Sequence, residues 1–246
     1  MRDGIHDRAS WAKLLIGFAV LFAILQGSAA VLHSLRGEAG LAVAAVTVGA
    51  ALLAQRFFFS GTWKAAFADL GLGAPSPRGI IVAIGVCALA LCAFPLFLMT
   101  QGGFISIYPG AAWLAFGIFL QAGVAEGILF RGFLYGNIRR GRTFWRAALL
   151  SMIPFAAAHL YLFATMAWPI ALTALALSVL IAFPFAWLYE LGGRTIWAPA
   201  IAHAVVQGAI KLIVIEDPAF AIVWMGASLV AMWVVFLVSS SAGSRS

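Results

Sequence analysis

The chain has 246 residues, of which 64% are hydrophobic and only 9% are charged, and its mean hydropathy is +1.06. A soluble domain carries about 25% charged residues, so this composition excludes a soluble globular protein and predicts a polytopic membrane protein. The formal net charge of +7 fits the excess of Lys and Arg in the cytoplasmic loops of membrane proteins. No separate basic domain is present, so we expect no nucleic-acid partner.

Eight apolar segments are candidates for membrane-spanning helices, because a helical span needs roughly 17 to 25 apolar residues. They are residues 13–33, 40–54, 79–99, 112–130, 147–166, 169–189, 196–215 and 218–238. We therefore predict an all-α membrane helical bundle of about eight spans, forming a single integral membrane domain over residues 1–246. The first segment resembles a signal peptide in its flanking residues, but its long apolar run and the spans that follow predict a retained anchor.

The distribution of basic residues predicts how these spans are oriented. With eight spans and a cytoplasmic N-terminus, Arg36 and Lys211 fall outside, whereas the remaining Lys and Arg of the loops and termini fall inside. Both termini are therefore predicted to be cytoplasmic, and the Ala- and Arg-rich composition favours a bacterial cytoplasmic membrane. Residues 55–78 are mixed in character and are predicted as an interfacial amphipathic helix ended by Gly73 and Pro75, or as an ordinary loop.

Four polar residues inside the predicted spans are the candidate catalytic groups. Glu126 lies in the fourth span, His159 in the fifth, and His203 and Gln207 in the seventh. An ionisable side chain in hydrocarbon costs several kcal/mol, roughly 2.5 to 3.5 on insertion scales, and usually marks function. Because residues four apart share a helix face, His203 and Gln207 are expected to point the same way, as are Phe155 and His159.

These residue types supply the groups that hydrolysis of a peptide bond needs. A carboxylate with a neutral histidine holds a water molecule and takes its proton. A second histidine and a carboxamide donate hydrogen bonds to the developing oxyanion, and each good donor is worth roughly 3 to 4 kcal/mol. Two alternatives stay open at this point. A histidine in a span is often an interhelical hydrogen bonder, and one Glu with two His matches a three-ligand zinc site in type.

Three ordered motifs resemble those of the CPBP intramembrane proteases, the group that includes the Rce1-type CAAX prenyl endopeptidases and the bacterial Abi proteins. The motifs are EGILFR at residues 126–131, Phe155-x-x-x-His159 and His203-x-x-x-Gln207, and the resemblance covers about residues 70–210. It implies a protease-like core over about residues 70–215, with the spans in 13–54 and at 218–238 as extra helices.

The resemblance also implies a role for each motif residue in a glutamic-type endopeptidase without an essential metal or other cofactor. Glu126 and His159 would activate water, and His203 with Gln207 would form the oxyanion site. Phe155 and Arg131 are expected to support the site or the substrate. The implied substrate is a peptide or a membrane protein in the lipid bilayer, cut near the cytoplasmic face.

Two positions depart from the pattern of that family. Gly127 stands where the pattern has a second glutamate, so Arg131 lacks its carboxylate partner four residues earlier and is expected to pair elsewhere or to contact substrate. Gln207 stands where the pattern has Asn or Asp, which keeps the amide and adds a methylene. These departures leave a non-catalytic scaffold or immunity protein, and a metal-dependent membrane hydrolase, as alternatives.

Overall fold

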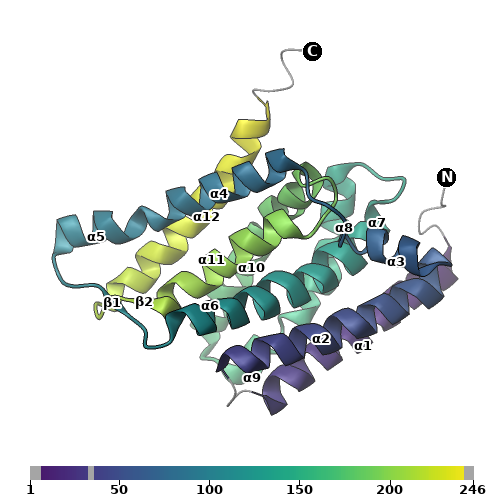
Figure 1. Ribbon diagram of the computed structural model, residues 1–246, viewed down its shortest axis with the longest axis horizontal. Helices are drawn as coiled ribbons and strands as arrows, with labels where there is room; N and C mark the ends of the chain where they lie inside the picture. Colours follow the sequence, from purple (N-terminus) through teal and green to yellow (C-terminus); the bar gives the residue numbers. More distant parts are fainter. Residues whose placement is uncertain (1–6, 33–35, 241–246) are drawn as a thin grey trace.

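A computed structural model shows an all-α helical bundle and describes residues 7–32 and 36–240 (Figure 1). Its α-helices are α1 (Arg8–Val31), α2 (Arg36–Gln55), α3 (Trp63–Asp69), α4 (Pro77–Leu91), α5 (Ala93–Gln101), α6 (Ala111–Ile118), α7 (Gly136–Arg139), α8 (Phe144–Ala158), α9 (Leu162–Thr165), α10 (Trp168–Leu191), α11 (Trp197–Leu212) and α12 (Ala219–Ser240). In this part of the chain, π-helical winding continues three of the helical stretches, at η1 (Arg56–Ser60), η2 (Phe119–Ala125) and η3 (Gly127–Tyr135). The short strands β1 (Ser106–Ile107) and β2 (Ile213–Val214) pair antiparallel.

Seven helical stretches of the described chain are long and apolar enough to cross a membrane. They are Arg8–Val31, Gly37–Ser60, Pro77–Gln101, Ala111–Arg139, Phe144–Thr165, Trp168–Leu191 and Ala219–Val238. Each of them overlaps one predicted span, so the prediction of a multi-pass membrane protein built from helices is confirmed. The second span, which was predicted to be short, is longer than expected because α2 continues into η1.

The remaining predicted span, residues 196–215, is shorter than a full membrane crossing. α11 has 16 residues, which is about 24 Å at 1.5 Å per residue, against about 30 Å of hydrocarbon. After α11 the chain becomes extended and forms β2, which pairs with β1. α11 packs against η2, α4 and α10, so it is an interior helix of the bundle. Seven of the eight predicted spans are therefore long apolar helices in the described chain, and α11 is a shorter helix that lies among them.

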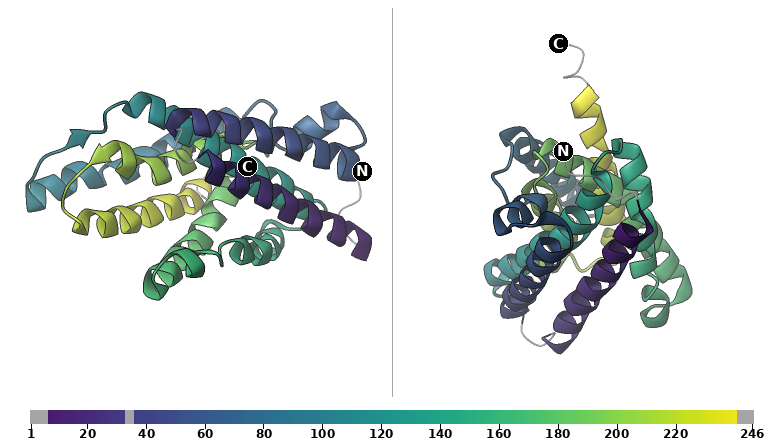
Figure 2. Two further views of the ribbon diagram at one scale, coloured as in Figure 1. Left: turned by 90° about the horizontal axis from the view of Figure 1, so that it is seen from below. Right: turned by 90° about the vertical axis from the view of Figure 1, so that its right-hand side faces the viewer.

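The chain segment from α8 to α10 is set apart from the other helices at one end. In both views of Figure 2 the end of this segment that carries α9 projects away from the rest of the bundle. The C-terminal half of α10 stays in the bundle, where it packs against α11, α12 and α4. α10 therefore covers α11 along only part of its length, and this arrangement bears on the groove described below.

Charged side chains of α7, of the C-terminal end of α10 and of the turn that follows it form one cluster around Glu190. Glu190 accepts a hydrogen bond from the Tyr135 hydroxyl at 2.8 Å, and it pairs with Arg139 at 2.8 Å and with Arg194 at 3.4 Å. These elements lie at the same end of the bundle as α3 (Figure 1). The two arginines were predicted to share the cytoplasmic side, and the structure brings them together. Which side of the membrane this end faces stays a prediction.

Residues 55–78 contain the short helix α3, which ends at Asp69 rather than at the predicted Gly73 and Pro75. The Thr62 side chain accepts a hydrogen bond from the Ala65 amide at 3.2 Å and caps the start of α3. At its end, Asp69 pairs with Arg140 at 3.0 Å. Trp63 is 54% exposed, as a ring at a membrane interface would be. The location of α3 at the membrane surface stays a prediction.

Replacing Glu190 by Ala should destabilise the bundle, because Arg139 and Tyr135 would both lose their carboxylate partner. We expect a loss of about 1–3 kcal/mol, since the Glu190 side chain is only 16% exposed. The control is Arg194→Ala, which removes a 56% exposed side chain and should cost at most about 1 kcal/mol. Thermal unfolding of the purified protein in detergent, followed by tryptophan fluorescence, measures both, and equal losses would contradict the prediction.

Candidate active site

Glu126 lies between two stretches of π-helix, η2 and η3. In a π-helix each backbone hydrogen bond joins residues five apart rather than four, so side chains five apart come to lie on one face. Glu126 and Arg131 are five apart, and their charges are close enough to interact. With α-helical spacing, Arg131 has no carboxylate partner along its own helix. The π-helical winding makes Glu126 an electrostatic neighbour of Arg131, although no ion pair between them is found in the described part of the chain.

Glu126 also faces His203, which projects from α11. Its Oε2 lies 3.8 Å from His203 Nε2, and the two side chains are 21% and 15% exposed. This separation is longer than a direct hydrogen bond, and it is the kind of polar contact in which a water molecule bridges the two groups. The structure therefore brings together two of the four predicted catalytic residues, from segments far apart in the sequence.

The approach of η2 to α11 depends on Gly123, which lies one turn before Glu126. A Cβ atom at Gly123 would lie 2.8 Å from the backbone oxygen of Ala200 on α11, closer than real Cβ contacts. At Gly127 a Cβ atom would meet only Ile196, at 3.7 Å, which is an ordinary van der Waals distance. Small residues at such crossings let two helix backbones approach closely, and Gly123 has that role here.

His159 lies at the C-terminal end of α8 and is oriented by its own motif. Its Nδ1 is 2.8 Å from the backbone oxygen of Phe155. Because a carbonyl oxygen only accepts hydrogen bonds, Nδ1 carries the proton, and the Nε2 lone pair of the neutral ring is free to accept one. The Phe155 ring packs against the imidazole with 4.3 Å between centroids. Phe155 thus fixes both the tautomer and the position of His159.

Arg131 is buried between the two histidines of the motifs by contacts with aromatic rings. It is 5% exposed, and its Cζ lies 4.9 Å from the Phe185 ring centroid and 5.8 Å from that of Phe155. Phe185 in turn lies 4.9 Å from the His203 ring. Desolvated cation–π contacts of this kind are worth about 2 kcal/mol. The sequence alone does not single out Phe185, because nothing in an apolar span marks one phenylalanine among many.

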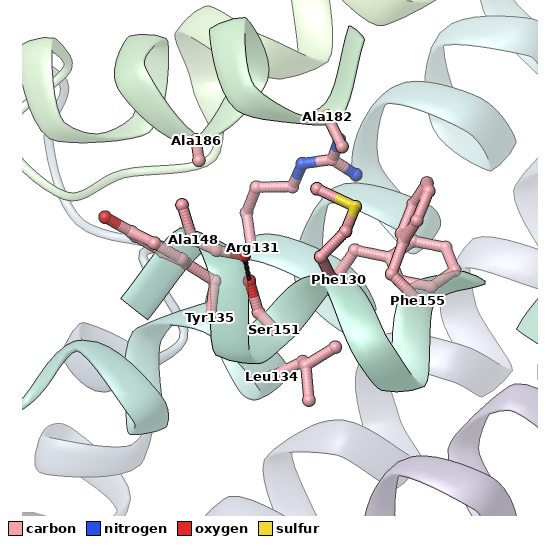
Figure 3. A pocket seen from close by; sticks show the side chains of 10 residues that line it. Phe130, Arg131, Leu134, Tyr135, Ala148, Ser151, Phe155, Ala182 and Ala186 are labelled. Atoms are coloured by element: carbon pink, nitrogen blue, oxygen red, sulfur yellow. Dashed lines mark hydrogen bonds between the residues drawn. The ribbon is translucent and has the colours of Figure 1, made fainter. Parts of the chain in front are cut away.

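A small cavity adjoins Arg131 between η3, α8 and α10 (Figure 3). In Figure 3 the guanidinium extends toward Ala182 of α10, whereas the Tyr135 hydroxyl points the opposite way. The cavity volume is about 20 Å³, enough for about one water molecule. It is too small for a peptide, so a substrate needs a different entrance to the site.

A larger groove lies beside His203, between α10, α11 and α12. Its volume is about 480 Å³, within the range of roughly 300 to 1,000 Å³ that is usual for ligand sites. Most of its lining is apolar, and His203, Gln207 and Lys211 form the α11 side. Gln207 therefore faces the same space as His203, as the spacing of the third motif predicted.

The alternative of a zinc site requires three metal ligands close together. Among residues 7–32 and 36–240, no three His, Cys, Asp or Glu side chains converge in a way that could hold a metal ion. Glu126 and His203 face each other, but His159 packs on Phe155 and does not complete a three-ligand site with them.

Residues 108–209 match a protein-family model described as Type II CAAX prenyl endopeptidase Rce1-like. The matched segment begins just after β1 and ends within α11. It includes all four predicted catalytic residues, and it lies within the region that the three motifs suggested. No curated protein matches the chain. The resemblance that the motifs indicated is confirmed over this segment.

Gly123→Ala should loosen the contact between η2 and α11, whereas Gly127→Ala should not. The first change puts a methyl group against the Ala200 backbone and should cost about 1–3 kcal/mol. The second puts the same methyl group at an ordinary van der Waals distance from Ile196 and should cost clearly less than the first. Thermal unfolding in detergent compares the two variants directly. If Gly127→Ala destabilises as much as Gly123→Ala, the close crossing is not what holds Glu126 beside His203.

Proposed function

Because residues 108–209 match the Rce1-like family model, we propose that this protein is an intramembrane endopeptidase of the glutamic type. It hydrolyses a peptide bond in a peptide or in a membrane protein, near the cytoplasmic face of a bacterial cytoplasmic membrane. The observation that carries the proposal is the pairing of Glu126 with His203 at 3.8 Å, next to a groove with room for a peptide segment. The seven long apolar helices put such a site within reach of membrane-bound substrates.

In this mechanism Glu126 is the general base. It takes a proton from a water molecule as the water oxygen bonds to the carbonyl carbon of the substrate. The C–N bond then breaks, and the protonated Glu126 returns the proton to the leaving amine. His159 assists at the water, because its Nε2 lone pair is free while Nδ1 donates to Phe155.

The oxyanion is assigned to the α11 side of the site. His203 and Gln207 both line the groove, so their N–H groups can face the carbonyl oxygen of a peptide that lies in it. The reacting carbonyl then lies between the base on η2–η3 and the donors on α11. Arg131 lies behind this centre as a positioning residue, and its buried charge favours the negative charge that develops there.

The alternative of a non-catalytic scaffold or immunity protein drew on Gly127 and Gln207. The geometry described above weakens the argument for this alternative at both positions. Arg131 interacts with Glu126 despite the missing carboxylate at 127, and Gln207 faces the groove despite its additional methylene. We therefore favour the catalytic assignment over the scaffold.

Glu126→Gln should abolish cleavage, because an amide cannot take the proton of the attacking water. A positioned general base contributes typically 10²- to 10⁴-fold, so we expect a fall of at least about 10²-fold in rate. Purified protein in lipid nanodiscs is incubated with a pool of apolar peptides, and products are identified by mass spectrometry. Glu38→Gln, an equivalent change at an exposed residue of α2, is the control and should keep the wild-type rate.

Chelators provide the second arm of this experiment. In a glutamic mechanism the wild-type rate should be unchanged by EDTA and by 1,10-phenanthroline. Cleavage that persists in the Glu126→Gln protein would contradict the assignment of the base. Cleavage that stops with the chelators and returns with added zinc would instead favour a metal-dependent hydrolase.

Gln207→Ala should lower kcat while leaving KM nearly unchanged, because an oxyanion donor acts in the transition state and not in substrate binding. Loss of one such donor typically costs about 10²- to 10³-fold in kcat. Gln207→Asn keeps the amide and should retain more activity than the Ala variant. Steady-state kinetics on a peptide found in the first assay measure both. A rise in KM with kcat unchanged would place Gln207 in substrate binding instead.

A further inference from the structure

Lys211 is an exposed cation that lines a mostly apolar groove. It lines the groove between α10, α11 and α12 together with His203 and Gln207. Among the residues that the structure describes, no carboxylate lies within ion-pair distance of its ammonium. Its positive charge acts on Glu126 and His203 from a longer distance. A lone ammonium in an apolar groove attracts an anion, and the groove lining itself contains no acidic residue.

Ser228 is a second polar residue that lines the same groove, from the α12 side. It is 2% exposed, and its Oγ has no hydrogen-bond partner within the described chain. A buried hydroxyl without a partner is destabilising, and a ligand with a hydrogen-bonding backbone would offset that cost. Apolar walls with a hydroxyl on one side and an ammonium on the other suit a short peptide segment better than a purely hydrocarbon ligand.

The spacing along α11 sets how far the anion would lie from the cleaved bond. Lys211 follows His203 by eight residues, which is about 12 Å along the helix axis. An extended peptide covers about 3.3–3.6 Å per residue, so about three or four residues bridge that distance. A carboxylate paired with Lys211 would thus belong to the same short segment whose carbonyl faces His203.

We propose that Lys211 binds a carboxylate of the substrate, a short distance along the chain from the bond that His203 and Gln207 face. Lys211 is then a specificity-determining residue, and Ser228 hydrogen-bonds the backbone of the same segment. The carboxylate has two possible sources, the end of the substrate chain or an Asp or Glu side chain. This inference rests on the proposed function for its meaning, but its test is a binding measurement that needs no cleavage.

The probes are three dansylated apolar tetrapeptides of the same length. One ends in a free carboxylate, one in an amide, and one in Asp with its terminus amidated. Binding to the Glu126→Gln protein in nanodiscs is followed by energy transfer from tryptophan, since Trp224 lines the groove. The same titrations are repeated with Lys211→Met and Lys211→Arg added to that background, and with Lys64→Met, which removes a lysine of α3 outside the groove, as the control.

With Lys211 in place, the free acid should bind about tenfold more tightly than the amide, a factor worth about 1.4 kcal/mol. Lys211→Met should remove this preference, whereas Lys211→Arg and Lys64→Met should keep it. If the Asp peptide binds like the free acid, a side chain can supply the carboxylate, and if it binds like the amide, the chain end supplies it. Equal affinity for acid and amide in the protein that retains Lys211 overturns the proposal, as does a preference that survives in Lys211→Met.

These outcomes are independent of the proposed function. If Glu126→Gln cleaves as fast as wild type, the endopeptidase assignment fails, and the preference for a carboxylate can still be measured. If cleavage depends on Glu126 but acid and amide bind alike, only the role of Lys211 fails. The acid and amide peptides are also compared on the protein that retains Lys211. This comparison remains valid even if Lys211→Met does not fold.

Discussion

The close crossing of the Glu126 helix with α11 is the contact on which the candidate site depends. A carboxylate inside a helical bundle is costly unless a partner compensates it, and His203 is presented to Glu126 only because η2 and α11 nearly touch at Gly123. The same crossing fixes the place of Gln207, which lies one turn further along α11 and faces the adjoining groove. The packing of these two helices therefore also determines where the candidate catalytic groups lie.

The π-helical winding around Glu126 adds a second constraint. It brings the charges of Glu126 and Arg131 near each other, although the two residues are five apart, and the Arg131 guanidinium lies among aromatic rings. One of these rings, Phe155, also sets the tautomer of His159. A cation held by ring faces keeps its charge without a tight ion pair, so the Glu126 carboxylate stays available for a water molecule. The three motifs thus meet through packing as well as through polar contacts.

Much of this arrangement can be predicted from the sequence alone, and the features that cannot be predicted have identifiable physical reasons. Composition and span length predict an all-α membrane protein, and the motif spacing predicts that His203 and Gln207 face one space. Spacing within a helix does not give distances between helices, so the approach of Glu126 to His203 needed the structure. The electrostatic neighbour of Arg131 was missed because π-helical winding leaves no mark in a residue pattern, and α11 was expected to be longer because its apolar run continues into β2.

The most direct test of the central claim is a comparison of protein termini in membrane fractions of the native host. Cells that express the wild-type chain are compared with cells that express Glu126→Gln at the same level, and new N- and C-termini are identified by mass spectrometry. If the protein is an endopeptidase that uses Glu126, a set of termini present with the wild type disappears in the variant, and those termini name the substrate. Identical termini in both, with the wild-type phenotype intact in the variant, would contradict proteolysis and favour a non-catalytic role.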